Sequence, residues 1–375
     1  MPIRILTLLD DDANGGDAAG RSRALDNVAQ QLGGDLDVHV VERGNQDTRQ
    51  VLRDAIATTP HDVLYLFGLA PRRITAVLAL QRLGLVPPAP VVVAPDGTIR
   101  AGGGAQSALR RGYLRAIRRS GVLRDVLWHA SGARECDDLV QVLGTTARVR
   151  IAPPLVGNTA AVDAARNERR RDKRVGELRI GVVARIDRES NVLAAIAMAG
   201  ALRGRVTLDV YGAVADAGYW RACEQAIVAL PADVVVRAHG PLPAAIAARV
   251  WASHHVCLVP SDGERATHVL HDALSAGCPV IVGDRAPWRD LEAQGIGWDL
   301  PISAPARFRA ALQRCADMTQ DELGEWGMRA AAYARARRDD AAVPDATVAL
   351  FREAVADARI GAATTPAAAR PALAA

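Results

Sequence analysis

The sequence has few of the residues that would indicate a disulfide framework, a zinc site or a membrane span. Its five cysteines lie far apart, form no CxxC pair and are odd in number. No apolar run approaches the roughly 20 residues that a membrane-spanning helix needs. The start, MPIRILTLLDDD, becomes acidic too early for a secretory signal peptide. These absences predict a protein of the reducing cytoplasm.

The net charge of the chain is also small, which gives no support to a nucleic-acid-binding or membrane-binding protein. The net charge of +4 and pI near 9.0 favour neither nucleic acid nor a membrane by themselves. We therefore expect no nucleic-acid partner. With 375 residues, 50% hydrophobic and 23% charged, the composition is that of a globular protein of about two domains.

Short apolar runs alternate with segments of helical spacing through most of the chain, which predicts parallel strands joined by crossover helices. The predicted strands are 3–9, 38–41, 63–67, 91–94 and 126–129, then 178–184, 207–211, 234–238, 256–259 and 280–282. The predicted helices include 21–32, 49–57, 73–83, 304–316, 320–337 and 343–357. A basic, turn-rich segment at 169–174 separates the halves and indicates an interdomain linker.

The segment 261–301 is the most informative part of the sequence. It reads as a loop, a helix, a short β-branched strand and a second loop. Glu264 precedes the helix and Asp272 lies within it, so both can face one crevice at the carboxyl edge of a sheet. Backbone N–H groups at the helix start, around Thr267, His268 and Val269, suit phosphate oxygens. Carboxylates, in turn, accept hydrogen bonds from sugar hydroxyls.

This segment resembles the C-terminal signature of the GT-B glycosyltransferases of family 4, which are retaining enzymes that use nucleotide-activated sugars. Glu264 matches the first acid of that signature and Asp272 replaces the second Glu. The AGCPVI run, the PW pair and the GW pair that follow match one branch of the family, as does WHAS with its later Glu in the first half. The matching residues are Ala273, Leu274, Gly277, Pro279, Val280, Ile281, Pro287, Trp288, Gly297, Trp298, Trp128, His129, Ala130, Ser131 and Glu135.

The resemblance implies an α/β chain of GT-B architecture, with two Rossmann-like doubly wound domains facing a cleft. We expect an acceptor-side domain over 1–172, with the helix 343–358 packing back on it. A nucleotide-sugar domain is expected over 176–342, and a disordered tail over 361–375. The Ala- and Pro-rich composition of that tail gives the same expectation.

The resemblance also implies roles for single residues. Glu264 would position the donor sugar, Asp272 would bind the ribose, and Arg185 in GVVARIDRESN would stabilise the leaving phosphate. Further donor contacts would come from Ser190, Thr267, His268, Val269, Gly240, Gly15 and Gly16. No cofactor is implied, and the Asp10, Asp11, Asp12 run is interpreted as a helix-capping loop because the family needs no metal.

Three positions depart from the family pattern. Ser190 stands where the family has a lysine that binds the pyrophosphate, Asp272 is shorter than glutamate, and Arg265, Ala266 and Thr267 replace a glycine-rich turn. The lost cation could be replaced by Arg188 or Arg265, both near the motif.

In the first half, Asp96 follows a strand at a position that the branch fills with Pro-Arg-Gly, in a loop facing acceptor and donor sugar. Two interpretations stay open for it: a carboxylate that binds acceptor hydroxyls in catalysis, or half of an ordinary Asp-Gly turn. For His129, between Trp and Ala at a strand end, we expect a packed, hydrogen-bonded side chain rather than a catalytic one.

The segment 109–124 is basic and amphipathic, with six arginines among apolar residues. It predicts either a helix lying on an anionic membrane surface, at the inner membrane face, or a solvated helix face over a core stripe.

Together these features predict a retaining, metal-independent hexosyltransferase. It would move a sugar from a nucleotide-diphosphate sugar to a glycan or lipid-linked acceptor in cell-surface polysaccharide synthesis. The alternative is a catalytically impaired GT-B module that binds a nucleotide sugar or a partner enzyme without transfer, which the three departures favour. A sugar phosphorylase or epimerase would need a lysine or extra acids that the sequence lacks.

Overall fold

The computed structural model describes residues 1–9, 18–41, 48–68, 71–99, 105–157, 172–261, 267–286 and 288–364. The chain divides into two compact units. Unit 1 comprises Met1–Pro154 with Ala341–Ala375, and unit 2 comprises Leu155–Asp340. Glu264, Gly15, Gly16, Arg265 and the three aspartates from Asp10 lie outside the described residues.

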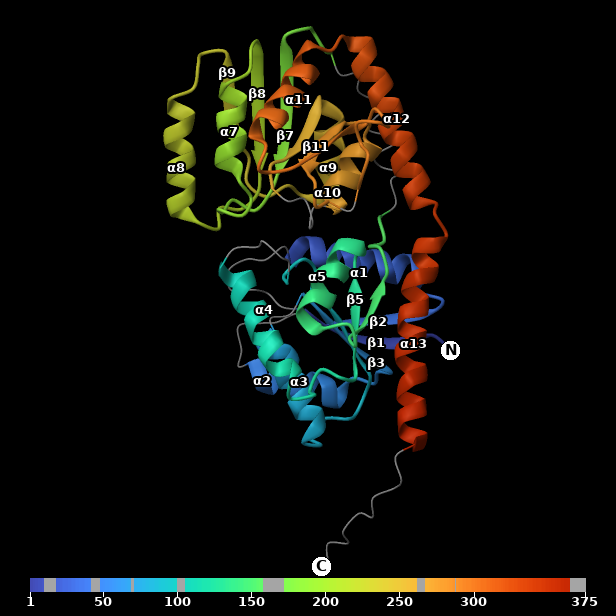
Figure 1. Ribbon diagram of the computed structural model, residues 1–375. Helices are drawn as coiled ribbons and strands as arrows, with labels where there is room; N and C mark the ends of the chain where they lie inside the picture. Colours follow the sequence, from blue (N-terminus) through green and yellow to red (C-terminus); the bar gives the residue numbers. More distant parts are fainter. Residues whose placement is uncertain are drawn as a thin grey trace, which may run out of the picture. The chain divides into compact units, whose positions relative to one another are not determined.

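Unit 1 contains one parallel six-stranded sheet with strand order β2-β1-β3-β4-β5-β6 (Figure 1). The chain alternates strand and helix before a last helix adds to the same unit. The elements are β1 (Ile3–Leu9), α1 (Ala18–Leu32), β2 (Leu36–Val41), α2 (Thr48–Thr58), β3 (Val63–Phe67), α3 (Pro71–Arg82), β4 (Val91–Ala94), α4 (Ala105–Arg118), β5 (Val126–Ala130), α5 (Ala133–Leu143), β6 (Arg148–Ile151) and α13 (Ala342–Thr364).

The inner strands of unit 1 are apolar on both faces because helices cover both faces. One face packs on α2, α3, α4 and α5, with Leu64 and Leu66 of β3 in that core. On the other face Tyr65 contacts Phe351 of α13 edge-on, with ring centroids 5.2 Å apart. Helix α13 is also held by ion pairs from Arg148 and Arg150 of β6 to Glu353.

Unit 2 contains a second parallel six-stranded sheet with order β12-β11-β10-β7-β8-β9 (Figure 1). Its elements are β7 (Glu177–Val183), α7 (Val192–Gly200), β8 (Arg205–Tyr211), α8 (Ala217–Val228), β9 (Val234–Ala238), α9 (Ala244–Ser253), β10 (Val256–Val259), α10 (Thr267–Ser275), β11 (Val280–Gly283), β12 (Gly297–Leu300), α11 (Pro305–Asp317) and α12 (Gln320–Arg338). The prediction of an α/β chain with two doubly wound parallel sheets is confirmed.

The strand order of unit 2 is that of the Rossmann fold, with β7 as the first strand and β10 as the fourth. The chain winds outward from β7 to β9, then returns to β10 and winds the other way. One face packs on α7, α8 and α11, and the other on α9, α10 and α12. Consecutive connections diverge between β7 and β10, and this switch point at the carboxyl ends of the strands, the crevice of unit 2, is where folds of this strand order bind ligands.

Several predicted bounds differ from the structure by one to three residues, and one helix and two strands differ more. Helix α4 ends at Arg118 instead of continuing to 124, because Gly121 takes a left-handed φ of 71° and its N–H bonds to the Arg118 carbonyl. The edge strands β6 and β12 were not expected. Among the described residues, no helix combines the length and apolar character needed to span a membrane.

Close backbone approach at the carboxyl ends of β7 and β8 requires glycine at position 212. Its φ is 153°, and a Cβ there would lie 1.8 Å from the Ala184 carbonyl oxygen. The Gly212 N–H donates to the Gly240 carbonyl at 2.7 Å, and the Ala184 N–H donates to the Tyr211 carbonyl at 2.9 Å. These bonds join the carboxyl ends of β7, β8 and β9 side by side.

We expect Gly212→Ala to lower the free energy of unfolding of unit 2 by more than about 2 kcal/mol, because overpacking and an unfavourable backbone conformation add. Urea-induced unfolding measures this change. Gly324→Ala is the matched control, since position 324 lies on the exposed side of α12 with nothing within 4 Å of an added Cβ. That variant should gain up to about 1 kcal/mol. Equal stabilities of the two variants would contradict the steric argument.

Candidate functional site

The loop that follows β7 contributes the best-defined charged group at the crevice of unit 2. Arg185 comes two residues after β7, and its side chain is 30% exposed. Its Nε is buried and has no hydrogen-bond partner among the described residues, with Asp187 Oδ2 3.6 Å away. Within the described residues the guanidinium is thus balanced only by a long ion pair to Asp187, and no hydrogen bond to Nε fixes it.

Asp187 and Ser190 close the same loop internally. Asp187 Oδ1 accepts hydrogen bonds from the backbone N–H groups of Glu189 and Ser190, both at 3.0 Å. The Ser190 hydroxyl donates to the Asp187 carbonyl at 2.7 Å, and Ser190 is only 8% exposed. The hydroxyl thus stabilises the turn that presents Arg185. A role for Ser190 in donor binding stays a prediction.

Asn191 joins this loop to the end of β10, across the crevice. Its Nδ2 donates to the Pro260 carbonyl at 2.9 Å. Asn191 also has a left-handed backbone, with φ 58° and ψ 29°, and it precedes the first turn of α7 without capping it through its side chain. Unfavourable backbone conformations of this kind concentrate at functional sites because surrounding contacts maintain them. Here the maintaining contact is the bond to Pro260.

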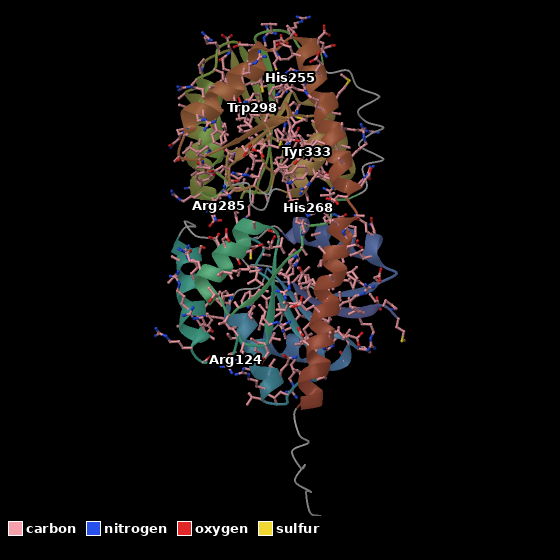
Figure 2. All side chains as sticks on the ribbon, turned by 45° about the vertical axis from the view of Figure 1, so that its right-hand side comes forward. Arg124, His255, His268, Arg285, Trp298 and Tyr333 are labelled. Carbon is pink, nitrogen blue, oxygen red and sulfur yellow. The ribbon has the colours of Figure 1, made fainter. Side chains whose placement is uncertain are left out.

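Helix α10 begins on the other side of the crevice. Thr267 is its first residue and is 9% exposed, while His268 and Val269 are partly exposed. Figure 2 shows His268 and Arg285 at one end of unit 2 and His255 at the opposite end. Arg285 lies two residues after β11, at the carboxyl edge of the sheet. The sequence analysis did not name Arg285 as a site residue. Its position just after a β-branched strand could have indicated that it lies at this edge.

Asp272 lies deeper in α10, in its buried part, and is 6% exposed. It is close enough to Cys257 of β10 for its charge to add to the effect of burial, which raises the pKa of that thiol well above its ordinary value. Little of the Asp272 carboxylate is therefore open to solvent. Its predicted contact with a ribose, and its convergence with Glu264, stay predictions.

Arg188 in the loop after β7 and Gly240 in the loop after β9 complete this edge. The side chain of Arg188, which was proposed as a substitute cation, is 81% exposed. Its Nε lies 3.8 Å from Oδ2 of Asp216. Such an exposed pair is weakly preorganised. Gly240 has φ 69°, and a Cβ added there would meet nothing within 4 Å. The backbone at Gly240 is thus accessible to a ligand, which suits its predicted place in the donor site.

Unit 1 has its own polar cluster at the carboxyl ends of β4 and β5. Asp96 is half-buried with a left-handed φ of 52°, and Gly97 follows with φ 71°. The Gly97 N–H donates to Glu135 Oε1 at 2.8 Å, while the Ser131 N–H and hydroxyl both donate to Oε2 at 2.8 Å. Burial raises the pKa of Glu135, although these three bonds oppose the rise. One buried carboxylate thus fixes the loop that presents Asp96.

His129 is packed and hydrogen-bonded, as expected from the sequence. Its Nδ1 lies 2.8 Å from the Tyr65 hydroxyl and its Nε2 lies 2.7 Å from the Ala152 carbonyl. Because a carbonyl only accepts, Nε2 carries the proton and Nδ1 accepts from Tyr65. Burial lowers the pKa of His129, in agreement with a neutral ring. Both nitrogens are therefore used within the protein.

Comparison with known proteins identifies the fold. No protein-family model and no curated protein sequence matches the chain. Solved structures do match over nearly its whole length. Sucrose-phosphate synthase from Thermosynechococcus elongatus is similar with a TM-score of 0.68 and 14% identity, covering 95% of this chain and 100% of that one.

Two other matches carry informative names. HepE from Anabaena in complex with UDP-glucose has a TM-score of 0.64 at 14% identity, over 96% of this chain and 100% of that one. WaaG, a glycosyltransferase involved in lipopolysaccharide biosynthesis, has a TM-score of 0.62 at 14% identity, over 92% of this chain and 98% of that one. The chain has the fold of these GT-B structures.

The Asn191 bridge across the crevice can be tested by two substitutions. Asn191→Gly removes the bond to Pro260 and keeps the left-handed φ, which glycine takes without strain. It should cost about 1 kcal/mol of unfolding free energy. Asn191→Ala removes the bond and adds the left-handed penalty of about 1 to 2 kcal/mol. Urea-induced unfolding should therefore rank parent above Gly above Ala. A Gly variant as stable as the parent would show that the bond contributes nothing.

Proposed function

We propose that this protein is a glycosyltransferase that binds a nucleotide-diphosphate sugar in unit 2 and transfers the sugar to a glycan or lipid-linked acceptor. The observation that carries the proposal is Arg185, whose buried Nε has no protein hydrogen-bond partner among the described residues, placed at the crevice of a Rossmann-ordered sheet. The match to GT-B structures over nearly the whole chain supports it, because one of these contains UDP-glucose.

In this proposal the pyrophosphate lies between the loop after β7 and the start of α10. Arg185 would neutralise the charge that grows on the leaving phosphate, and the backbone N–H groups at Thr267, His268 and Val269 would donate to its oxygens. The basic groups and the helix start at this edge would do the work that a divalent metal does in other transferases. We therefore infer a metal-independent reaction.

Glu264 would bind the hydroxyls of the donor sugar and Asp272 the ribose, as the family resemblance implies. Gly15 and Gly16 would let the backbone approach the donor in the turn after β1, and Asp96 would bind the acceptor hydroxyl. We infer a retaining hexosyl transfer in which that hydroxyl attacks from the face that the phosphate leaves. We propose that the protein acts in the cytoplasm. The sugar that it transfers would become part of a cell-surface polysaccharide.

Calorimetric titration with UDP, GDP and ADP sugars tests the donor site directly. We expect one class to bind, and Arg185→Ala to weaken its binding by about 10- to 100-fold, because a charge-assisted hydrogen bond contributes about 1.5 to 3 kcal/mol. Arg205→Ala is the matched control, since Arg205 begins β8 at the opposite edge and pairs with Glu177. Failure of every nucleotide to bind, or equal losses in both variants, would overturn the proposal.

Transfer itself needs a separate measurement, because a specific observation favours the impaired alternative. The Ser190 hydroxyl is used within its own loop, so nothing at this position supplies the cation that the family has there. If the parent is active, Glu264→Ala should abolish transfer while nucleotide affinity persists, chelator should leave the rate unchanged, and NMR should show a retained anomeric configuration. The binding module would give a different result. The parent would bind the donor but form no transfer product, and the Ser190→Lys variant would hydrolyse the donor slowly.

We also propose that unit 1 contacts an anionic membrane through α3 and α4. Neither helix contains Asp or Glu. Exposed leucines accompany the arginines, with Leu83 71%, Leu85 47% and Leu109 74% exposed. The arginines of α3, α4 and the turn after α4 are Arg72, Arg73, Arg82, Arg110, Arg111, Arg115, Arg118, Arg119 and Arg124.

Sedimentation with lipid vesicles tests this surface. Phosphatidylcholine vesicles containing phosphatidylglycerol should bind the parent, and Arg115→Glu with Arg119→Glu should weaken binding by more than about tenfold. Each basic residue near such a surface contributes about 1 kcal/mol. Arg221→Glu, an exposed change on α8 of unit 2, is the control and should bind as the parent does. A parent that ignores anionic vesicles would contradict the proposal.

A further inference from the structure

Strand β9 forms one edge of the sheet of unit 2, with β8 as its neighbour (Figure 1). Its sequence is VVVRA and Asp233 precedes it, so this edge consists of an acid, three valines and a base in that order. Valine favours an extended backbone, and a regular apolar edge strand is a template on which a further strand can pair. The proposed transfer chemistry does not use this edge.

The hydrogen bonds to β8 determine which backbone groups of β9 point to the open side. The Asp233 carbonyl accepts from β8 and the His239 N–H donates to β8, both at 2.9 Å. In a parallel pair, residues that bond to one neighbour alternate with residues whose backbone groups point away from it. Val234 and Val236 are therefore the residues whose groups point outwards. The Val234 N–H donates to the Pro231 carbonyl at 3.0 Å, so its carbonyl and both groups of Val236 can bond to a new strand.

The side chains of β9 alternate between a buried and an exposed face. Val234 is buried, and Val236 packs against the same core as α7 and α8. Val235 points to the opposite face and is 43% exposed. Asp233 and Arg237 lie two positions to either side of Val235 and are exposed with it. Because side chains two positions apart share a face, this face presents a negative charge, an apolar centre and a positive charge along the edge.

Asp233 and Arg237 differ in one respect from the charged residues of the other three edge strands. Those residues have charge partners within their own unit. The pairs are Asp37 with His39 at β2, Arg150 with Glu353 at β6, and Asp299 with Arg289 at β12. Asp233 and Arg237 have no ion-pair partner among the residues that the structure describes. Both charges are therefore available to a molecule that pairs with β9.

We propose that β9 pairs antiparallel with β9 of a second copy of this chain, about a twofold axis between the two Val235 residues. Arg237 of each copy then lies opposite Asp233 of the other. The Val236 N–H donates to the Val234 carbonyl of the other copy, and the axis repeats this bond. The charge pairs and the valine pair occupy the non-hydrogen-bonded positions of the ladder, where opposite Cα atoms are about 4.5 Å apart and side chains interact most closely.

A second copy is the partner that the charges favour, because this edge is complementary to its own reverse. An antiparallel copy opposes acid to base at both ends, whereas a parallel copy in register would oppose like charges. Antiparallel pairing joins the two sheets of unit 2 into one, and the carboxyl ends of their strands face opposite directions. The crevices of the two copies therefore open in opposite directions, and neither copy contributes to the donor site of the other. This inference goes beyond the proposed function and does not depend on it.

Sedimentation equilibrium of the full chain over a range of protein concentrations tests the proposal. We expect the parent to form a dimer that dissociates on dilution, because a strand of five residues supplies few bonds. Arg237→Glu replaces two attractive charge pairs by two repulsive ones, so the dissociation constant should rise by about tenfold or more. Asp233→Arg should have the same effect. Combining Asp233→Arg with Arg237→Glu restores opposite charges, and this double variant should dimerise as the parent does.

Arg309→Glu is the matched control and should dimerise as the parent does. Arg309 is exposed on α11, which packs against β7, β11 and β12 and not on the β9 edge. A parent that stays monomeric at every concentration overturns the proposal. A dimer that neither single variant weakens, or a double variant that stays as weak as the single ones, overturns the pairing through β9. Because the double variant must recover what each single variant loses, general destabilisation cannot imitate the expected result.

Discussion

The reversal of strand order between β7 and β10 is the constraint on which unit 2 depends. Parallel strands need crossover helices, and winding in two directions from one central pair places those helices on opposite faces. The loops at the carboxyl ends then part between β7 and β10. The Asn191 bond to Pro260 spans this gap, and the Gly212 bonds extend the ordered edge to β9. These bonds therefore order the backbone along this edge.

Much of the fold was predictable because the inner strands are continuous apolar runs between turn residues. Residues 3–9, 63–67 and 91–94 were predicted with the bounds that the structure has. The edge strands were missed for a physical reason. Arg148–Ile151 alternates charged and apolar residues at a half-exposed edge, and Gly297–Leu300 is four residues long with a glycine and an aspartate. These segments become strands because they pair with a neighbouring strand. Their own sequences contain almost no pattern that predicts a strand.

The candidate site was predictable only in part. The family resemblance singled out Arg185 and Gly240, and the structure has both in loops that follow strands, at the carboxyl edge of the sheet. The inward hydrogen bond of Ser190 and the burial of Asp272 depend on how loops and helices pack, which single-residue patterns do not encode. The hydrogen bonds that join Asp209 to His239 and His254 were not predicted for the same reason. These three residues come from β8, from the end of β9 and from the end of α9, and only the folded sheet brings them together.

Glu135 has a consequence for motion in unit 1. Its two oxygens receive hydrogen bonds from the loop after β4 and from the loop after β5, so neither loop can move without breaking a buried, charge-assisted contact. Within the described residues, Gly97 of one loop and Ser131 of the other are therefore tied to the same carboxylate. Asp96 is carried on the first of these loops with its backbone already in a rare conformation. The conformational entropy of this loop is lost when the chain folds. Binding of an acceptor to Asp96 would therefore not include that entropic cost.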